Sequence, residues 1–319
     1  MKVVFMGTPD FAKDSLEAIY NANHEILAVV TNQDKPKGRG MKMIPTPVKE
    51  FALEKSLKIF QPEKVRNNND FINSIKQLNP DIICVVAYGK ILPKEILEIP
   101  KLGCINVHAS LLPKYRGAAP IQWAILNGDK VTGITTMYMD EGMDTGDMIL
   151  KEEVEINDNE TTGELWDRLS KIGGKLLVET LEQIQNGTAP REKQNENFTI
   201  APMLNKEMAK IDWANKSAIE IKNLVRGLNP IMGAYSYLEG KKLKFWKVDV
   251  TNFFDITIGT DINKIKNGTV IISNEKDGLY IKAKDGIIKV LEIQGENAKR
   301  MSILEYLRGN KIKEYSVFE

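Results

Sequence analysis

The chain has 319 residues, of which 42% are hydrophobic and 27% charged, values typical of a globular protein of two domains. No apolar run approaches the roughly 20 residues that a membrane-spanning helix needs, so we expect no membrane partner. The chain opens on a strand-like run rather than on a basic segment and an apolar core, and we expect no secretion signal. These features favour a cytoplasmic protein, which we expect to be a monomer.

The two cysteines, Cys84 and Cys104, lie in apolar runs, which favours reduced residues of a buried core. Two cysteines cannot build a metal cluster alone, and we expect no metal. The net charge of +1 is distributed unevenly, because residues 206–319 hold 20 basic and 15 acidic residues, a net charge of +5. A basic C-terminal third weakly indicates a polyanionic partner, and chance variation on a solvated surface explains it equally well.

Up to residue 185 the chain alternates apolar runs with helical patterns. Strands are predicted at Lys2–Met6, Glu25–Val30, Asp81–Ala87, Cys104–His108 and Gly133–Met139. Helices are predicted at Phe11–Asn21, Pro47–Lys55, Phe71–Leu78, Pro120–Asn127 and Thr162–Gln185. This alternation indicates an α/β domain, placed at residues 1–188, with a mostly parallel sheet and helices on both of its faces.

The pattern changes beyond this domain. Residues 189–207 are polar and contain two prolines, as is typical of a linker. The region 208–319 then shows one helix and a series of short strands. The helix is predicted at Ser217–Gly227. The strands are predicted at Ala234–Leu238, Leu243–Val250, Thr269–Ser273, Leu279–Ala283 and Ile287–Ile293. Short strands separated by turn signals suggest a small OB-like β-barrel.

Of the two histidines, His24 lies at a helix-to-strand turn and is interpreted as a surface residue. His108 ends the strand C-I-N-V-H, and Asn106 lies two positions before it, so both side chains share one face of the strand. Ligands of open parallel sheets bind beyond the carboxyl ends of the strands. An amide beside an imidazole suits an oxyanion site, although local hydrogen bonding would explain the pair equally well.

An acidic segment, D-E-G-M-D-T-G-D at 140–147, follows the strand that ends near Met139. It lacks the ligand spacing of an EF-hand, and a solvated loop remains one interpretation. The other is that one of its carboxylates orients the imidazole and stabilises its protonated form.

Two further loops could bind anions. G-T-P-D-F-A at 7–12 follows the first strand and opens the first helix, but it is not a dinucleotide fingerprint. D-K-P-K-G-R-G-M-K-M at 34–43 carries four basic residues, and it is interpreted either as a solvated loop or as an arm that grips phosphates.

Together, these segments resemble the folate-dependent formyltransferases. The N-x-H pair, Asn106 and His108, with the later aspartate of D-x-x-x-D, Asp144, matches the catalytic triad of that family. S-L-L-P at 110–113, followed by Y-R-G-A-A-P-I-Q, matches its folate-binding segment.

The whole chain is similar to the members of that family that act on methionyl-tRNA. The similarity extends over V-V-A-Y-G-K-I-L-P at 85–93, residues 103–147, I-D-W at 211–213 and R-G-L-N-P at 226–230. Two departures concern the linker and the C-terminal region. Ile231 and Met232 stand where W-P is usual, and A-P-M-L-N-K lacks the usual lysine after its proline.

The resemblance implies a Rossmann-like domain, a linker and an OB-like C-terminal domain that contacts the tRNA backbone. It also implies 10-formyltetrahydrofolate as formyl donor and initiator methionyl-tRNA as acceptor. The folate-binding residues that it implies are Lys90, Ile91, Leu92, Ser110, Leu111, Leu112, Pro113 and Asp140. The tRNA-binding residues that it implies are Lys35, Lys37, Arg39 and Lys42.

The chemistry that this triad would perform needs neither a metal nor a covalent enzyme intermediate. Asn106 and protonated His108 would donate hydrogen bonds to the oxyanion that forms when the amine attacks the formyl carbon. Asp144 would stabilise the protonated imidazole and help to relay the proton.

Three alternatives remain at this point. One is formyl transfer to a small amine, such as a sugar nucleotide or glycinamide ribonucleotide, and another is hydrolysis of the formyl-folate. The third is a non-enzymatic RNA-binding protein that uses only the barrel.

Overall fold

The computed structural model describes residues 1–37, 41–251 and 262–319. These residues form two compact units. The first unit comprises Met1–Pro120, Val131–Glu155 and Trp166–Pro202, and the second comprises Ile121–Lys130, Ile156–Leu165 and Met203–Glu319. Among the helices in the described ranges, none has the length and apolar character needed to cross a membrane.

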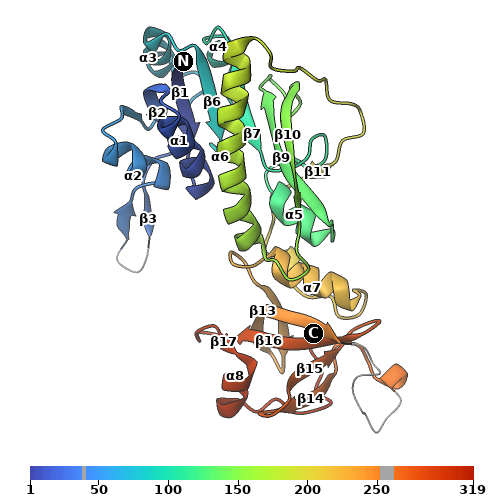
Figure 1. The fold of residues 1–319 in the computed structure, drawn as a ribbon. Coiled ribbons are helices and arrows are strands. Elements are labelled where there is room, and N and C mark those ends of the chain that lie inside the picture. The colour runs from blue at the N-terminus through green and yellow to red at the C-terminus, as the bar shows by residue number, and fades with distance from the viewer. Residues whose placement is uncertain (38–40, 252–261) are drawn as a thin grey trace. The chain divides into compact units, whose positions relative to one another are not determined.

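The first unit is built on a seven-stranded sheet with the strand order β10-β9-β7-β6-β1-β2-β5 (Figure 1). Its strands are β1 (Lys2–Gly7), β2 (Glu25–Val30), β5 (Ile59–Phe60), β6 (Ile82–Val86), β7 (Cys104–His108), β9 (Val131–Tyr138) and β10 (Met148–Glu155). The five neighbouring strands β7, β6, β1, β2 and β5 run parallel to one another. Strand β9 is antiparallel to β7, and β10 is antiparallel to β9. The mostly parallel sheet predicted from the sequence is therefore confirmed.

Helices cover both faces of this sheet, as the sequence predicts. The helices that lie wholly or partly in the first unit are α1 (Asp10–Asn21), α2 (Pro47–Glu54), α3 (Asn69–Leu78), α4 (Lys94–Leu97), α5 (Pro120–Leu126) and α6 (Thr162–Asn186). A Cβ atom built on Gly173 of α6 would lie 3.1 Å from Val107 of β7 and 3.6 Å from Phe11 of α1, so α1 and α6 cover one face. Buried residues of α3 and α4 pack with Ile83 and Val85 of β6 on the other face.

Two small pairs of strands complete the first unit. A hairpin joins β3 (Lys35–Lys37) to β4 (Lys42–Ile44), in the region that the sequence interpretation treated as a loop. A parallel pair joins β8 (Arg116–Gly117) to β11 (Ile200–Ala201). The second pair brings a segment from beyond α6 next to the loop that follows β7.

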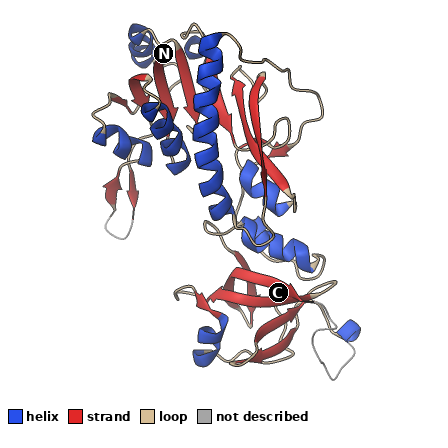
Figure 2. Ribbon diagram, in the orientation of Figure 1, coloured by secondary structure: helices blue, strands red, loops and turns tan. Residues whose placement is uncertain are grey.

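The second unit is mainly antiparallel sheet (Figure 2). Its strands are β12 (Ala234–Leu238), β13 (Lys241–Thr251), β14 (Val270–Asn274), β15 (Gly278–Lys282), β16 (Ile287–Gln294) and β17 (Met301–Ser302). Besides most of α5 and the first turn of α6, its helices are α7 (Ala218–Gly227) and α8 (Ile303–Gly309), with 3-10 turns at Glu207–Ala209 and Ile262–Lys264. The separate C-terminal strand domain is confirmed, and its OB-like barrel closure stays a prediction.

The interior of the second unit is an aromatic and aliphatic core. Trp213 packs edge-on against Phe245 at 6.0 Å between ring centroids, and Phe318 lies 5.5 Å from Phe245. The N-terminus of α7 is closed by a capping box between Ser217 and Glu220, which satisfies backbone N–H groups that the helix leaves unpaired. Short strands around such a core explain the alternating apolar pattern of this region.

Candidate active site

Strand β7 carries the two polar residues that the sequence singled out. Its neighbours β6 and β9 pair with it on both sides, so the strand is held along its length. Side chains alternate along a strand, and Asn106 and His108 therefore project from the same face. His108 is 6% exposed and Asn106 is half-buried, which leaves the amide within reach of a ligand.

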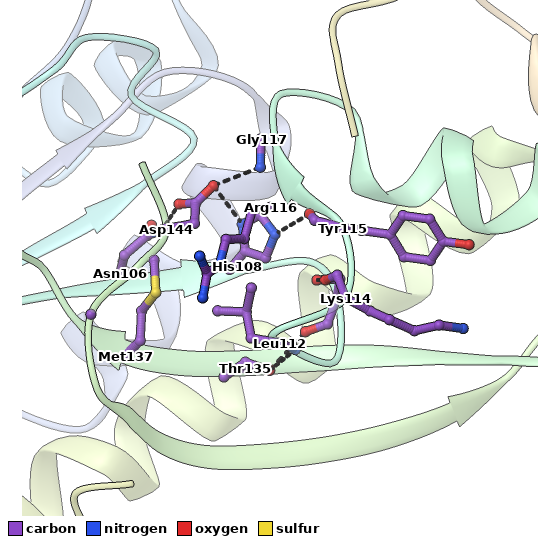
Figure 3. A network of polar contacts seen from close by, with 12 residues as sticks. Asn106, His108, Leu112, Lys114, Tyr115, Arg116, Gly117, Thr135, Met137 and Asp144 are labelled. Atoms are coloured by element: carbon purple, nitrogen blue, oxygen red, sulfur yellow. Dashed lines mark hydrogen bonds and ion pairs between the residues drawn. The ribbon is translucent and has the colours of Figure 1, made fainter. Parts of the chain in front are cut away.

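The imidazole of His108 is fixed by a backbone carbonyl. Its Nε2 atom lies 2.8 Å from the oxygen of Tyr115 (Figure 3). A carbonyl oxygen can only accept a hydrogen bond, so Nε2 carries a proton and donates it. The other nitrogen, Nδ1, faces the carboxylate of Asp144 with a separation of 3.7 Å from Oδ2. Any proton that the neutral ring gains is consequently placed on Nδ1.

Asp144 lies where three contacts meet (Figure 3). Its Oδ2 atom accepts a hydrogen bond from the backbone N–H of Gly117 at 2.8 Å, in addition to facing His108. Its Oδ1 atom lies 3.5 Å from Nδ2 of Asn106. The backbone of Asp144 has a φ of 55°, in the left-handed region that non-glycine residues seldom adopt. Such backbone conformations cluster at functional sites, where the surrounding structure holds them.

The loop that contains Asp144 reaches the site from an unexpected direction. Since β9 is antiparallel to β7, its last residue, Tyr138, lies beside Ile105 near the start of β7. The loop 140–147 therefore begins near that end and returns over the face that bears Asn106. Asp140 fastens this loop, because its Oδ1 accepts hydrogen bonds from the N–H of Gly142 at 3.0 Å and the hydroxyl of Thr145 at 2.6 Å.

The predicted folate segment after β7 is tightly folded. The hydroxyl of fully buried Ser110 donates to the oxygen of Lys114 at 2.5 Å, and Leu112 is 2% exposed. Thr135 of β9 ties the segment down, donating to the oxygen of Ser110 and accepting from the N–H of Leu112. Leu111 and Pro113 are half-buried. The buried members of this segment shape the loop, and its half-buried members are available to a ligand.

The second predicted folate segment follows β6. The ammonium group of Lys90 donates hydrogen bonds to the backbone oxygens of Pro62 and Glu63 at 2.7 and 2.9 Å. Desolvation lowers the pKa of Lys90. Leu92 is buried in the core below, whereas Ile91 is 75% exposed. Lys90 is thus engaged by the protein, and Ile91 is the member of this segment that presents an apolar surface to solvent.

The predicted tRNA-binding residues map to the β3–β4 hairpin. Lys35 and Lys42 are exposed on its two strands, and the backbone of Lys37 pairs with that of Lys42. Arg39 lies outside the described residues. At the base of the hairpin, Lys49 donates to both carboxylate oxygens of Asp34 at 2.7 and 2.9 Å, and this hydrogen bonding holds the pKa of Asp34 below its usual range.

The sequence interpretation missed the groups that hold the triad. The oxygen of Tyr115 and the N–H of Gly117 are backbone atoms, to which a side-chain pattern gives no clue. Tyr115 has a φ of 62° and Gly117 a φ of 119°. A glycine directly after Tyr-Arg in a loop is the one signal that could have indicated an unusual backbone there.

A hollow of about 460 Å³ lies near the start of β7, lined in part by Leu97, Cys104, Tyr138 and Arg191. None of the triad residues lines it, and the hydrogen-bonding geometry, not this hollow, locates the candidate chemistry. Throughout residues 1–37, 41–251 and 262–319, no three His, Cys, Asp or Glu side chains gather as a metal site would require.

Comparison with known proteins identifies the family. The Formyl transferase family matches residues 1–181, and the Formyl transferase, C-terminal domain family matches residues 203–311. The chain therefore belongs to the formyl transferase family, whose members use folate-derived formyl donors.

Full-length relatives place the chain within that family. It is 54% identical to the methionyl-tRNA formyltransferase of Clostridioides difficile over 98% of each chain. It is 49% identical to the methionyl-tRNA formyltransferase of Caldanaerobacter subterraneus over 100% of each. The chain is a member of this methionyl-tRNA formyltransferase group, which confirms the predicted enzyme class.

A solved structure supports the fold. The N-formyltransferase of Helicobacter canadensis, in complex with folinic acid and dTDP-3-aminofucose, superimposes with a TM-score of 0.65 at 22% identity, over 91% of this chain and 99% of the other. At this identity the match confirms the predicted fold class.

The geometry around Gly117 generates a prediction. A Cβ atom there would lie 2.8 Å from the oxygen of Ala201, and a φ of 119° is accessible to glycine alone at little cost. We expect Gly117→Ala to move the N–H away from Asp144 and to lower kcat for formyl transfer by about tenfold or more.

The matched control is Gly187→Ala. Gly187 also has a positive φ, 69°, but no atom lies within 4 Å of a Cβ built on it. Equal rate losses in the two variants would show that backbone strain alone, rather than the contact with Asp144, causes the effect.

Proposed function

We propose that the protein transfers the formyl group of 10-formyltetrahydrofolate to the free amine of initiator methionyl-tRNA, as a monomer in the cytoplasm. The observation that carries this proposal is the convergence of Asn106, His108 and Asp144, each within 3.7 Å of another member of the set. The full-length similarity to methionyl-tRNA formyltransferases supports the acceptor. We also propose domain boundaries at residues 1–188 and 208–319, with a linker between them.

The reaction is an acyl transfer between two nitrogens. The amine nitrogen attacks the formyl carbon, a new N–C bond forms, and the bond from that carbon to N10 of the folate breaks. The proton that the amine loses goes to N10. Between these events the formyl oxygen carries negative charge, which preorganised hydrogen-bond donors stabilise.

Asn106 and His108 supply these donors in the proposed mechanism. Asn106 has two N–H groups and needs at most one for its long contact with Asp144. His108 uses Nε2–H for Tyr115, so only Nδ1–H of the protonated ring can serve the oxyanion. The carboxylate of Asp144 stabilises that protonated ring and accepts the proton that passes from the amine toward N10.

The β3–β4 hairpin is the proposed contact to the tRNA acceptor end. Its described basic side chains, Lys35 and Lys42, are exposed, and Met41 and Met43 are 67% and 55% exposed beside them. The ion pair at its base ties the hairpin to α2 through Lys49. Exposed cations on an anchored hairpin suit the phosphates of a nucleic acid. The basic residues of the second unit are proposed to contact the tRNA backbone.

Substitution of the triad tests the catalytic part. We expect Asn106→Ala and Asp144→Asn each to lower kcat by about a hundred- to a thousandfold, the usual cost of removing one donor to an oxyanion or its support. The measurement is formylation of methionyl initiator tRNA with 10-formyltetrahydrofolate. Circular dichroism and thermal unfolding provide the control, since neither change removes a core contact. If either variant keeps kcat/KM near wild type, the role given to that residue is wrong.

The same assay separates the alternatives. Release of formate without any acceptor would indicate a hydrolase, and formylation of a sugar-nucleotide amine in place of tRNA would indicate a small acceptor. Protein that consumes no formyl-folate under any of these conditions would contradict the enzyme assignment altogether.

The hairpin yields a separate prediction. We expect the double variant Lys35→Ala/Lys42→Ala, and Arg39→Ala, to raise KM for tRNA and leave KM for the folate unchanged. The slope of log(kcat/KM) against log salt concentration should become shallower by about one for each phosphate that the variant no longer neutralises.

Lys64→Ala/Lys76→Ala is the matched control, because these lysines are exposed in the same unit but lie outside the hairpin. An unchanged salt slope in the hairpin variants, or an equal change in the control, would contradict a role of the hairpin in binding tRNA.

A further inference from the structure

The segment 194–201, which follows α6, contacts both loops that hold the triad. One of these loops, residues 110–119, supplies the oxygen of Tyr115 and the N–H of Gly117. The other, residues 140–147, supplies Asp144. We call the segment 194–201 the brace. It lies outside every sequence motif that indicates the catalytic triad or the folate-binding segments.

Gln194 is the contact of the brace with the acidic loop. Its Nε2 donates hydrogen bonds to the backbone oxygens of Asp144 and Gly146, each at 2.8 Å. Its Oε1 accepts a hydrogen bond from Nε of Arg116 at 2.9 Å. One half-buried side chain thereby joins the backbone of Asp144 to the loop that holds His108. Asp144, whose backbone oxygen accepts the first of these bonds, has a φ of 55°.

The remainder of the brace holds the other loop. The hydroxyl of Thr199 accepts from the N–H of Tyr115 at 2.8 Å, and its backbone oxygen accepts from the N–H of Arg116 at 2.8 Å. The oxygen of Ala201 accepts from the N–H groups of Ala118 and Ala119. These bonds leave the oxygen of Tyr115 aimed at His108 and the N–H of Gly117 aimed at Asp144.

Arg116 connects the two halves of the brace. Its side chain is 8% exposed, and its guanidinium lies 4.5 Å from the ring centroid of Phe198. The same guanidinium donates to Gln194. A buried cation stacked on a ring and hydrogen-bonded to an amide has few alternative positions. These contacts restrain the position of Gln194 relative to the loop that contains Tyr115.

We infer that Gln194 is a positioning residue for the formyl transfer, and that it acts by holding Asp144 against Nδ1 of His108. The inference rests on the proposed function, because it concerns the rate of that reaction. The hydrogen bonds of Gln194 go to backbone atoms of the acidic loop, to Arg116 and, at 4.0 Å, to Sδ of Met137, and none goes to a side chain of the triad. Its amide holds the backbone from which the carboxylate of Asp144 projects, so its loss displaces a catalytic group without removing one.

Two substitutions separate positioning from packing. Gln194→Ala removes these three hydrogen bonds and a long contact of Nε2 with Sδ of Met137 at 4.0 Å. Gln194→Glu keeps an acceptor for Arg116, now charged, but cannot donate to the oxygens of Asp144 and Gly146 and repels them. We expect both variants to lower kcat by about a hundredfold, the effect of a displacement of about 1 Å at the reacting groups, with KM for folate and tRNA within about threefold of wild type.

The readout that a merely structural role would not give is the contrast between stability and rate in Gln194→Glu. Its ion pair with Arg116 should keep the thermal midpoint above that of Gln194→Ala, whereas kcat should fall at least as far as in Gln194→Ala. The matched control is Gln183→Ala on α6, whose amide nitrogen donates to the carboxylate of Glu179 on the same helix and which should leave kcat unchanged. A Glu variant with wild-type kcat would overturn the inference.

A double-mutant cycle with Asp144→Ala completes the test, measured in single turnovers at high enzyme concentration. Where no carboxylate remains to be positioned, adding Gln194→Ala should lower the rate by less than about threefold. Independent, multiplying losses would overturn the inference. Wild-type protein that fails to formylate methionyl-tRNA would instead contradict the proposed function, so the two failures are distinguishable.

Discussion

The hydrogen bond from Nε2 of His108 to the oxygen of Tyr115, 2.8 Å long, determines which ring nitrogen can take part in chemistry. With Nε2 engaged by a carbonyl, Nδ1 is the only position at which the ring can gain a proton, and that position faces Asp144. A histidine whose tautomer is fixed by a backbone contact is a common arrangement in sites that move protons. The oxyanion role of His108 then requires the protonated ring, and the stabilisation of that ring requires Asp144.

This constraint explains why three separate chain segments meet at the site. Strand β7 carries Asn106 and His108, the following loop supplies two backbone groups, and the loop after β9 supplies Asp144. Two of the backbone positions, Tyr115 and Asp144, have positive φ, a conformation that costs free energy unless neighbouring contacts hold it. The brace 194–201 supplies such contacts to both loops.

Much of this arrangement could be predicted from the sequence. Each predicted strand and helix appears within two residues of its predicted ends, because apolar runs and helical spacing report burial directly. Strand β10 was missed since it lies at the sheet edge, where its charged middle, Lys151–Glu153, is mostly exposed and hides the pattern. The direction of β9 was not predictable either, as a buried strand has the same composition whether parallel or antiparallel. The triad residues were singled out by type and spacing, but the backbone groups that orient them have no side-chain signature, and Gln194 lies in a stretch that resembles any polar linker.

The most direct test of this account is the protonation of His108, observed by nitrogen-15 NMR of the imidazole rings. The chain has two histidines, so a His24→Gln variant assigns the signals. At a pH where the ring is neutral, the account predicts a proton on Nε2 and none on Nδ1, and the same tautomer in Asp144→Asn, because Tyr115 and not Asp144 fixes it. A neutral ring protonated on Nδ1 would contradict the account, since Nε2 would then be free and the oxyanion donor would have to be assigned anew.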